Sequence, residues 1–103
     1  MAETSSHRRA KGRAAGTNGK TEVPLSGKRR LDALTPSGKA TEIERSGNTQ
    51  RLEAAARRLK AASAKQHVLQ VPQKDMEPAV KAMQKTGVAG TVKNMSGTKR
   101  RSV

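Results

Sequence analysis

Residues 29–46 of this 103-residue chain have the sequence RRLDALTPSGKATEIERS. Residues 29–35 alternate in side-chain character as an extended strand does. PSGK at 36–39 has the Pro and Gly of a tight turn, and residues 40–46 continue as a second strand. The stretch therefore predicts a β-hairpin, which places its two halves next to each other.

The region after the hairpin alternates between helix and strand patterns. Small and apolar residues recur at helical spacing over residues 47–66, and Asn48 or Thr49 can cap this helix. HVLQVP at 67–72 is a short apolar strand that Pro stops. KDMEPAVKAMQKTG at 74–87 predicts a second helix that ends at its Gly.

Shorter strands complete the pattern at TEVPL (21–25) and on both sides of NMSG near the C-terminus. The order is strand, strand, strand, helix, strand, helix, strand, strand. This order predicts an α/β (or α+β) fold, in which a small mixed β-sheet and two helices form one domain over residues 21–103.

Residues 1–20 contain five Lys or Arg, one acidic residue and three Gly. We expect them to form a disordered basic N-terminal tail. The alternative is a helix in SHRRAKGRAA that becomes ordered on nucleic acid.

The charge predicts a polyanionic partner, because 22 Lys and Arg stand against 8 Asp and Glu, for a net charge of +14. Nucleic acid, DNA or RNA, is the expected partner. A membrane surface is not expected, because no segment combines basic residues with a bulky apolar face. The chain has no Phe, Tyr or Trp, which disfavours the RRM and OB modules that stack bases on aromatic rings.

Other features of the composition limit the class of protein. The absence of Cys excludes disulfides and thiolate metal sites. Neither a secretory signal nor a transmembrane run is evident, so we expect a cytoplasmic protein, or one located wherever its nucleic acid is. Large apolar residues are few, and a largely disordered basic protein is therefore an alternative.

Acidic residues are concentrated in one part of the chain. Asp32, Glu42 and Glu44 lie in the hairpin, and Glu22 lies just before it. Two residues apart on a strand, Glu42 and Glu44 should share a face, with Ile43 on the other face under the following helix. Asp32 should lie close to one of them across the ladder.

Clustered carboxylates need a cation among them, and oxygen ligands suit Mg²⁺ (or Mn²⁺). In a basic protein this pattern indicates metal-dependent phosphodiester hydrolysis. The alternative is that the acids pair with basic neighbours, namely Arg29, Arg30, Lys39 and Arg45, on an exposed hairpin.

The run Glu22 … Asp32 … Glu42-Ile43-Glu44 resembles the PD-(D/E)XK, or restriction-endonuclease-like, nuclease superfamily. That family has an acid near a first helix, an Asp strand, a Glu-x-Lys strand, a crossover helix and a further strand. The resemblance implies a DNA or RNA nuclease in which Asp32 and Glu42 are catalytic metal ligands and Glu22 is an outer ligand. Glu44 stands at the Lys position, where it would be a further ligand or the general base.

A nuclease of this size would act as a homodimer or as part of a larger protein. The residues expected to hold the phosphate backbone are Arg29, Arg30, Arg45, Arg57, Arg58, Lys99, Arg100 and Arg101. The alternative function is a non-catalytic nucleic-acid-binding protein whose acids are structural.

Overall fold

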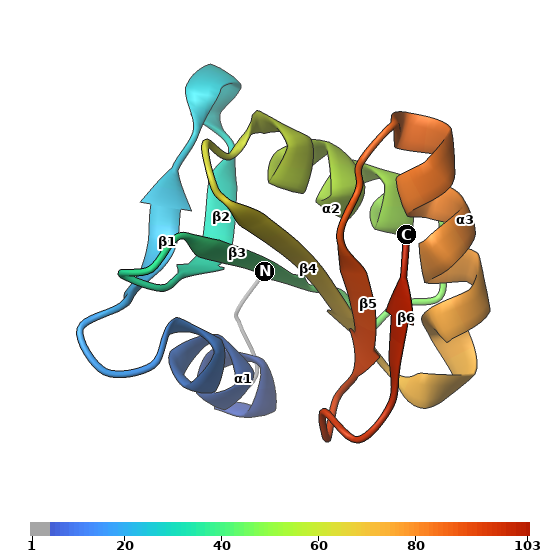
Figure 1. Cartoon of the computed structure of the whole chain (residues 1–103), viewed down its shortest axis with the longest axis horizontal. Helices are drawn as coiled ribbons and strands as arrows, with labels where there is room; N and C mark the ends of the chain where they lie inside the picture. The colour runs from blue at the N-terminus through green and yellow to red at the C-terminus, as the bar shows by residue number, and fades with distance from the viewer. Residues whose placement is uncertain (1–4) are drawn as a thin grey trace.

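A computed structural model describes residues 5–103, which form three α-helices and one six-stranded sheet (Figure 1). The helices are α1 (Ser5–Ala15), α2 (Thr49–Ala61) and α3 (Met76–Thr86). The strands are β1 (Lys20–Pro24), β2 (Arg30–Leu34), β3 (Lys39–Ile43), β4 (Gln66–Val71), β5 (Thr91–Asn94) and β6 (Arg100–Ser102). Short 3₁₀ turns occur at Ser26–Lys28 and Gln73–Asp75.

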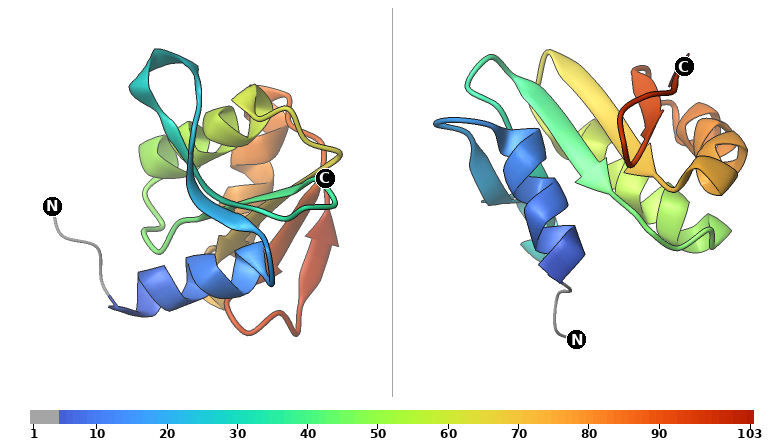
Figure 2. Two further views of the ribbon diagram at one scale, coloured as in Figure 1. Left: turned by 90° about the vertical axis from the view of Figure 1, so that its left-hand side faces the viewer. Right: turned by 90° about the horizontal axis from the view of Figure 1, so that it is seen from below.

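The strands lie in the sheet in the same order as in the chain. Strands β1, β2 and β3 are antiparallel, β3, β4 and β5 are parallel, and β6 is antiparallel to β5. Helices α2 and α3 are the crossovers between the parallel strands, and they pack side by side on one face of the sheet (Figures 1 and 2). The predicted order of eight elements and the mixed sheet are therefore confirmed.

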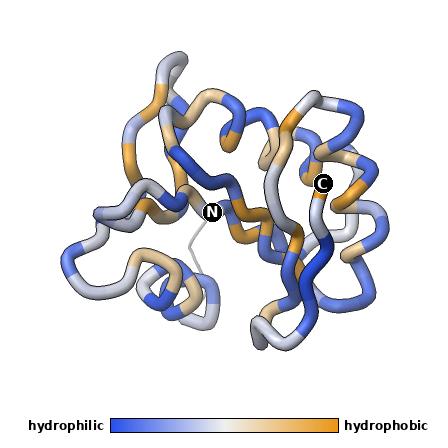
Figure 3. Tube along the Cα trace, viewed as in Figure 1, coloured by the Kyte–Doolittle hydropathy of each residue, from blue (hydrophilic) through white to orange (hydrophobic). Residues whose placement is uncertain are grey.

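The main core lies between the sheet and the α2–α3 layer. Leu69 of β4 and Leu52, Leu59 and Met83 of the helices are fully buried there. Ala55 and Ala56 of α2 and Ala79 and Ala82 of α3 belong to the same core, which is built without any aromatic residue. Figure 3 shows apolar residues gathered along the central strands, whereas β6 and most loops are hydrophilic.

The ends of the two crossover helices follow the expected local chemistry. The Asn48 side chain accepts a hydrogen bond from the backbone N–H of Arg51 at 3.2 Å and caps α2. Gly87 ends α3 in the left-handed conformation, with φ of 77°, which Gly adopts without steric cost.

The prediction of a disordered tail over residues 1–20 is wrong for residues 5–15, which form α1; residues 1–4 lie outside the described part of the chain. Ala10, Lys11 and Ala15 are buried where α1 packs against β1, β2 and β3, on the face opposite α2 and α3. The small alanine side chains give a weak local pattern, and only packing on the sheet shows which side of the helix is buried.

Candidate functional site: a buried ionic cluster and a basic groove

The β2–β3 hairpin is interrupted at Asp32 and Glu42. Regular pairing ends at Ala33 and Thr41, and side chains replace the next backbone bonds. The backbone N–H of Asp32 donates to Glu42 Oε2 at 2.7 Å, and the N–H of Ile43 donates to Asp32 Oδ2 at 2.8 Å. The hairpin thus brings Asp32 and Glu42 together, as the sequence predicts, and places each carboxylate between the strands.

Glu42 is completely buried and faces α2, where Arg58 Nε donates to Glu42 Oε1. Burial, reinforced by the nearby Asp32 carboxylate, raises the pKa of Glu42 to about 8, although Arg58 opposes this shift. Burial also raises the pKa of Asp32 against the opposing effects of the Ile43 hydrogen bond and of His7 on α1, whose Nε2 lies 3.7 Å from Asp32 Oδ2. Glu42 therefore retains its proton into the neutral range.

Glu44 does not join this pair. Strand β3 ends at Ile43, and the Glu44 side chain accepts a hydrogen bond from the backbone N–H of Ser46 at 2.9 Å. The predicted orientation of the strand is also wrong. Glu42 points toward α2, and Ile43 therefore points to the opposite face, because neighbouring side chains on a strand alternate.

Glu22 lies on β1 opposite Asp32, between the paired residues Thr21 and Val23. Its carboxylate is 46% exposed and contacts Lys11 Nζ at 3.2 Å, so it is directed to α1. Its φ of 53° is unusual for a residue with a side chain and marks local strain in β1. A chain of ionisable groups thus crosses the sheet from α1 to α2.

The predicted metal site is not assembled in this arrangement. Among residues 5–103, no group of three or more His, Asp or Glu side chains could hold a metal ion. Both oxygens of Glu42 already accept protein hydrogen bonds, and the Arg58 guanidinium lies against one of them. In this arrangement neither oxygen of Glu42 is free to bind Mg²⁺, which takes carboxylate oxygens as ligands.

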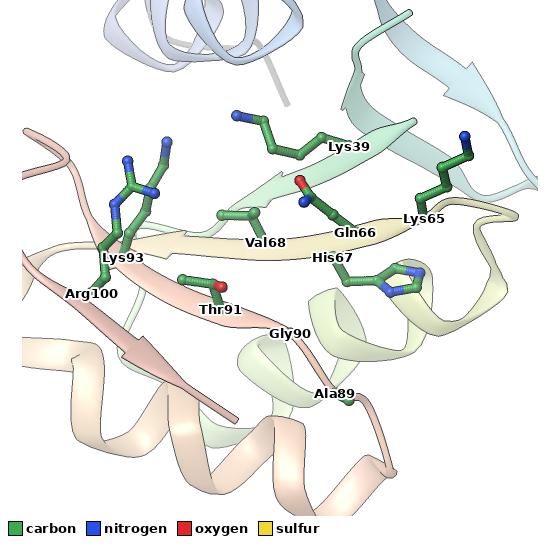
Figure 4. A pocket seen from close by; sticks show the side chains of 10 residues that line it. All are labelled: Lys39, Lys65, Gln66, His67, Val68, Ala89, Gly90, Thr91, Lys93 and Arg100. Carbon is green, nitrogen blue, oxygen red and sulfur yellow. The ribbon is translucent and has the colours of Figure 1, made fainter. Parts of the chain in front are cut away.

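A basic groove lies on the face of the sheet that α2 and α3 do not cover, beside α1. It has a volume of about 420 Å³, and its floor comes from β3, β4 and β5. Four cations surround it, and the described residues of its lining include no Asp or Glu. These cations are Lys39, Lys65, Lys93 and Arg100. In Figure 4, Lys93 and Arg100 stand side by side, and Lys39 reaches out from β3 on the same side of the sheet.

The cations of the groove repel one another. Lys93 of β5 is paired directly with Arg100 of β6, and like charges in directly opposite positions destabilise a sheet. Partial burial of Lys93, followed by the charges of Lys39 and Arg100, lowers its pKa. Such a group of cations favours a bound anion. An anion would offset both the repulsion between the cations and the hydration that Lys93 loses on burial.

Most residues predicted to hold phosphate lie elsewhere. Arg100 lines the groove, but Arg58 faces Glu42, and Arg57 and Arg101 pair with Glu53 and Glu77. The others are exposed around the molecule, namely Arg29, Arg30, Arg45 and Lys99.

Sequence reasoning missed Lys39, Lys65 and Lys93 as groove residues. A local signal existed for Lys93, because its alternation with buried Val92 on a strand places it on the outer face. Their convergence depends on β3 and β5 both flanking β4, which the spacing of residues along the chain does not reveal.

No family model, curated protein or solved structure matches this chain. Within the described residues, no helix is long and apolar enough to span a membrane. The function must therefore be inferred from the groove and from the ionic cluster.

Proposed function

We propose that this protein binds nucleic acid, DNA or RNA, through the basic groove. The observation that carries the proposal is the convergence of Lys39, Lys65, Lys93 and Arg100 around one hollow without a carboxylate in its described lining. A phosphate backbone supplies repeated negative charges to such a row of cations, and the release of counterions drives its binding.

The shape of the groove also suits a backbone ligand. Its floor contains small residues, including Val68, Gly90 and Thr91, which leave room above β4 and β5. Its cations come from three strands and one loop, so they are spread along the hollow rather than gathered at one point. Phosphate contacts of this kind position a nucleic acid without reading its sequence.

Removal of two groove cations should weaken binding and reduce its salt dependence. For a Lys39→Gln/Lys93→Gln variant we expect about tenfold weaker binding to duplex DNA or RNA at moderate salt. The slope of log affinity against log salt should become shallower by about two, because about two phosphate contacts are lost. Fluorescence anisotropy over a salt series measures both quantities.

The matched control is Lys81→Gln, which removes an exposed Lys from α3 on the opposite layer. Its affinity and salt slope should remain those of the wild type, apart from a small effect of net charge. Because Lys81→Gln removes one charge and the groove variant removes two, a loss of log affinity half as large in Lys81→Gln would show that binding depends on total charge and not on the groove.

A nuclease of the restriction-endonuclease-like class is the second candidate function. The observation that favours it is the contact of Asp32 with Glu42 at the break in the hairpin, together with the strained Glu22 beside them. The element order α1, β1, β2, β3, α2, β4 also includes a first helix before the Asp strand, as the resemblance requires. The close contacts of Glu42 with Arg58 count against it.

The nuclease candidate predicts cleavage of plasmid DNA or RNA that requires Mg²⁺ or Mn²⁺ and stops with EDTA. Activity should be lost in Asp32→Ala, while groove binding of uncut nucleic acid remains. Glu77→Ala, which removes an exposed acid on α3, is the matched control and should cleave normally. No cleavage by the wild type with either metal would eliminate this candidate and leave nucleic-acid binding in place.

A further inference from the structure

A second, smaller cavity adjoins the groove, between α1 and the turn that joins β5 to β6. It has a volume of about 200 Å³ and shares Lys39 and Lys93 with the groove. Arg13 of α1, Gln70 of β4 and Ser96 of the turn also line it. The cavity therefore extends the basic surface of the groove into the space between α1 and the β5–β6 turn, which form its opposite walls.

Gln70 gives this cavity a feature that the groove lacks. The residue is only 6% exposed, and its Nε2 donates to the backbone oxygen of Met95 at 3.0 Å. This bond fixes which end of the amide is nitrogen and which is oxygen. Gln70 Oε1 is buried and has no hydrogen-bond partner within the described part of the chain. Leaving a buried acceptor without a hydrogen-bond donor costs folding free energy, and a donor from outside the chain would remove that cost.

We propose that this cavity receives an unpaired base of the nucleic acid in the groove, with a base N–H donating to Gln70 Oε1. The proposal rests on the proposed function, since the groove must first hold the backbone. An anion alone does not meet both needs of the site: Lys39, Lys93 and Arg13 attract phosphate, whereas an amide oxygen requires an N–H donor. A nucleotide carries both a phosphate and, on its base, an N–H donor.

The partner is therefore a single strand or a loop. In a duplex the Watson–Crick N–H groups are already paired, whereas an unpaired base presents them. The cavity is smaller than typical sites for drug-sized ligands, in keeping with one base rather than a larger ligand. The Arg13 guanidinium can stack on the base, in place of the aromatic rings that this protein lacks.

The test compares the affinities of the wild type for a single-stranded thymidine oligomer and for an abasic strand of the same length. Their phosphates are equivalent, so a difference reports the base. We expect the thymidine strand to bind about fivefold more tightly, as one buried hydrogen bond with its desolvation provides. Gln70→Leu should lose most of this preference and keep its affinity for the abasic strand. Gln84→Leu, which changes an exposed Gln of α3 on the opposite layer, should keep the preference.

Outcomes that contradict the base pocket can be distinguished from outcomes that contradict the proposed function. Equal binding of both strands by the wild type would overturn the base pocket and would indicate that a water molecule satisfies Gln70 Oε1, while the groove would stand. A preference that persists in Gln70→Leu would also overturn it. If neither strand binds and the Lys39→Gln/Lys93→Gln variant changes nothing, the proposed function itself fails. Because the strand comparison uses the wild type, it does not depend on the folding of a variant.

Discussion

The free energy of unfolding should fall by a few kcal/mol as the pH rises from about 5 to about 9, because of Glu42. Its pKa is about 8 in the folded protein, against 4.5 for the free side chain. Between these values the folded state holds a proton that the unfolded state has released. The stabilisation is therefore complete below about pH 4.5 and is lost as the pH rises through about 8.

The groups around Glu42 support a fall, and not a rise, in the free energy of unfolding as the pH increases. Asp32, whose pKa burial also raises, contributes in the same direction. Arg58 of α2 is the cation in contact with Glu42, and His7 and Lys11 of α1 act on Asp32 from the other side of the sheet. These groups oppose the rise in the pKa values of Glu42 and Asp32, but they do not outweigh the burial of the two carboxyl groups.

Urea denaturation at pH 5 and pH 9 measures the effect in the wild type and in Glu42→Gln. The Gln variant retains the shape of the side chain and has no titrating group, so its free energy of unfolding should change much less between the two pH values. An equal pH dependence in both proteins would show that Glu42 is not the group responsible. Greater stability of the wild type at pH 9 than at pH 5 would contradict the account directly.

Leu69→Ala should lower the free energy of unfolding by about 3 kcal/mol. Leu69 is completely buried at the centre of β4, in the core between the sheet and the α2–α3 layer. Its truncation removes apolar contacts and leaves a cavity that the surrounding strands and helices cannot fill by local movement.

Val68 provides the matched control, because it precedes Leu69 and points to the opposite face, into the floor of the groove. Val68→Ala should cost no more than about 1 kcal/mol, since one side of this residue adjoins the groove. Thermal or urea unfolding of both variants measures the difference. A larger cost for Val68→Ala than for Leu69→Ala would show that the main core lies on the other face of the sheet.

The order of strands and helices from residue 20 onward could be predicted because each element carries a local signal. Alternation marks the hairpin, helical spacing and Asn48 mark α2, and Gly87 marks the end of α3. Helix α1 could be predicted only as the alternative to a disordered tail, because its buried face consists mainly of alanines among Gly and Arg residues. Its order comes from packing on β1, β2 and β3, which is a tertiary effect.

Less of the candidate site than of the fold could be predicted from the sequence. The contact between Asp32 and Glu42 follows from the hairpin, but the end of β3 at Ile43 removes Glu44 from the cluster. A shift of one residue along a strand moves each side chain to the other face of the sheet. The groove was beyond local reasoning, because Lys39 and Lys93 come together only through the sheet order.

Mapping of amide chemical shifts during titration with an unlabelled oligonucleotide tests the central claim most directly. The account predicts that the largest changes lie along the groove, at Lys39, Val68, Thr91 and Lys93, and that they diminish as salt is added. The exposed face of α2 and α3 should change little. The largest changes on α2 and α3, with the groove unaffected, would contradict the account.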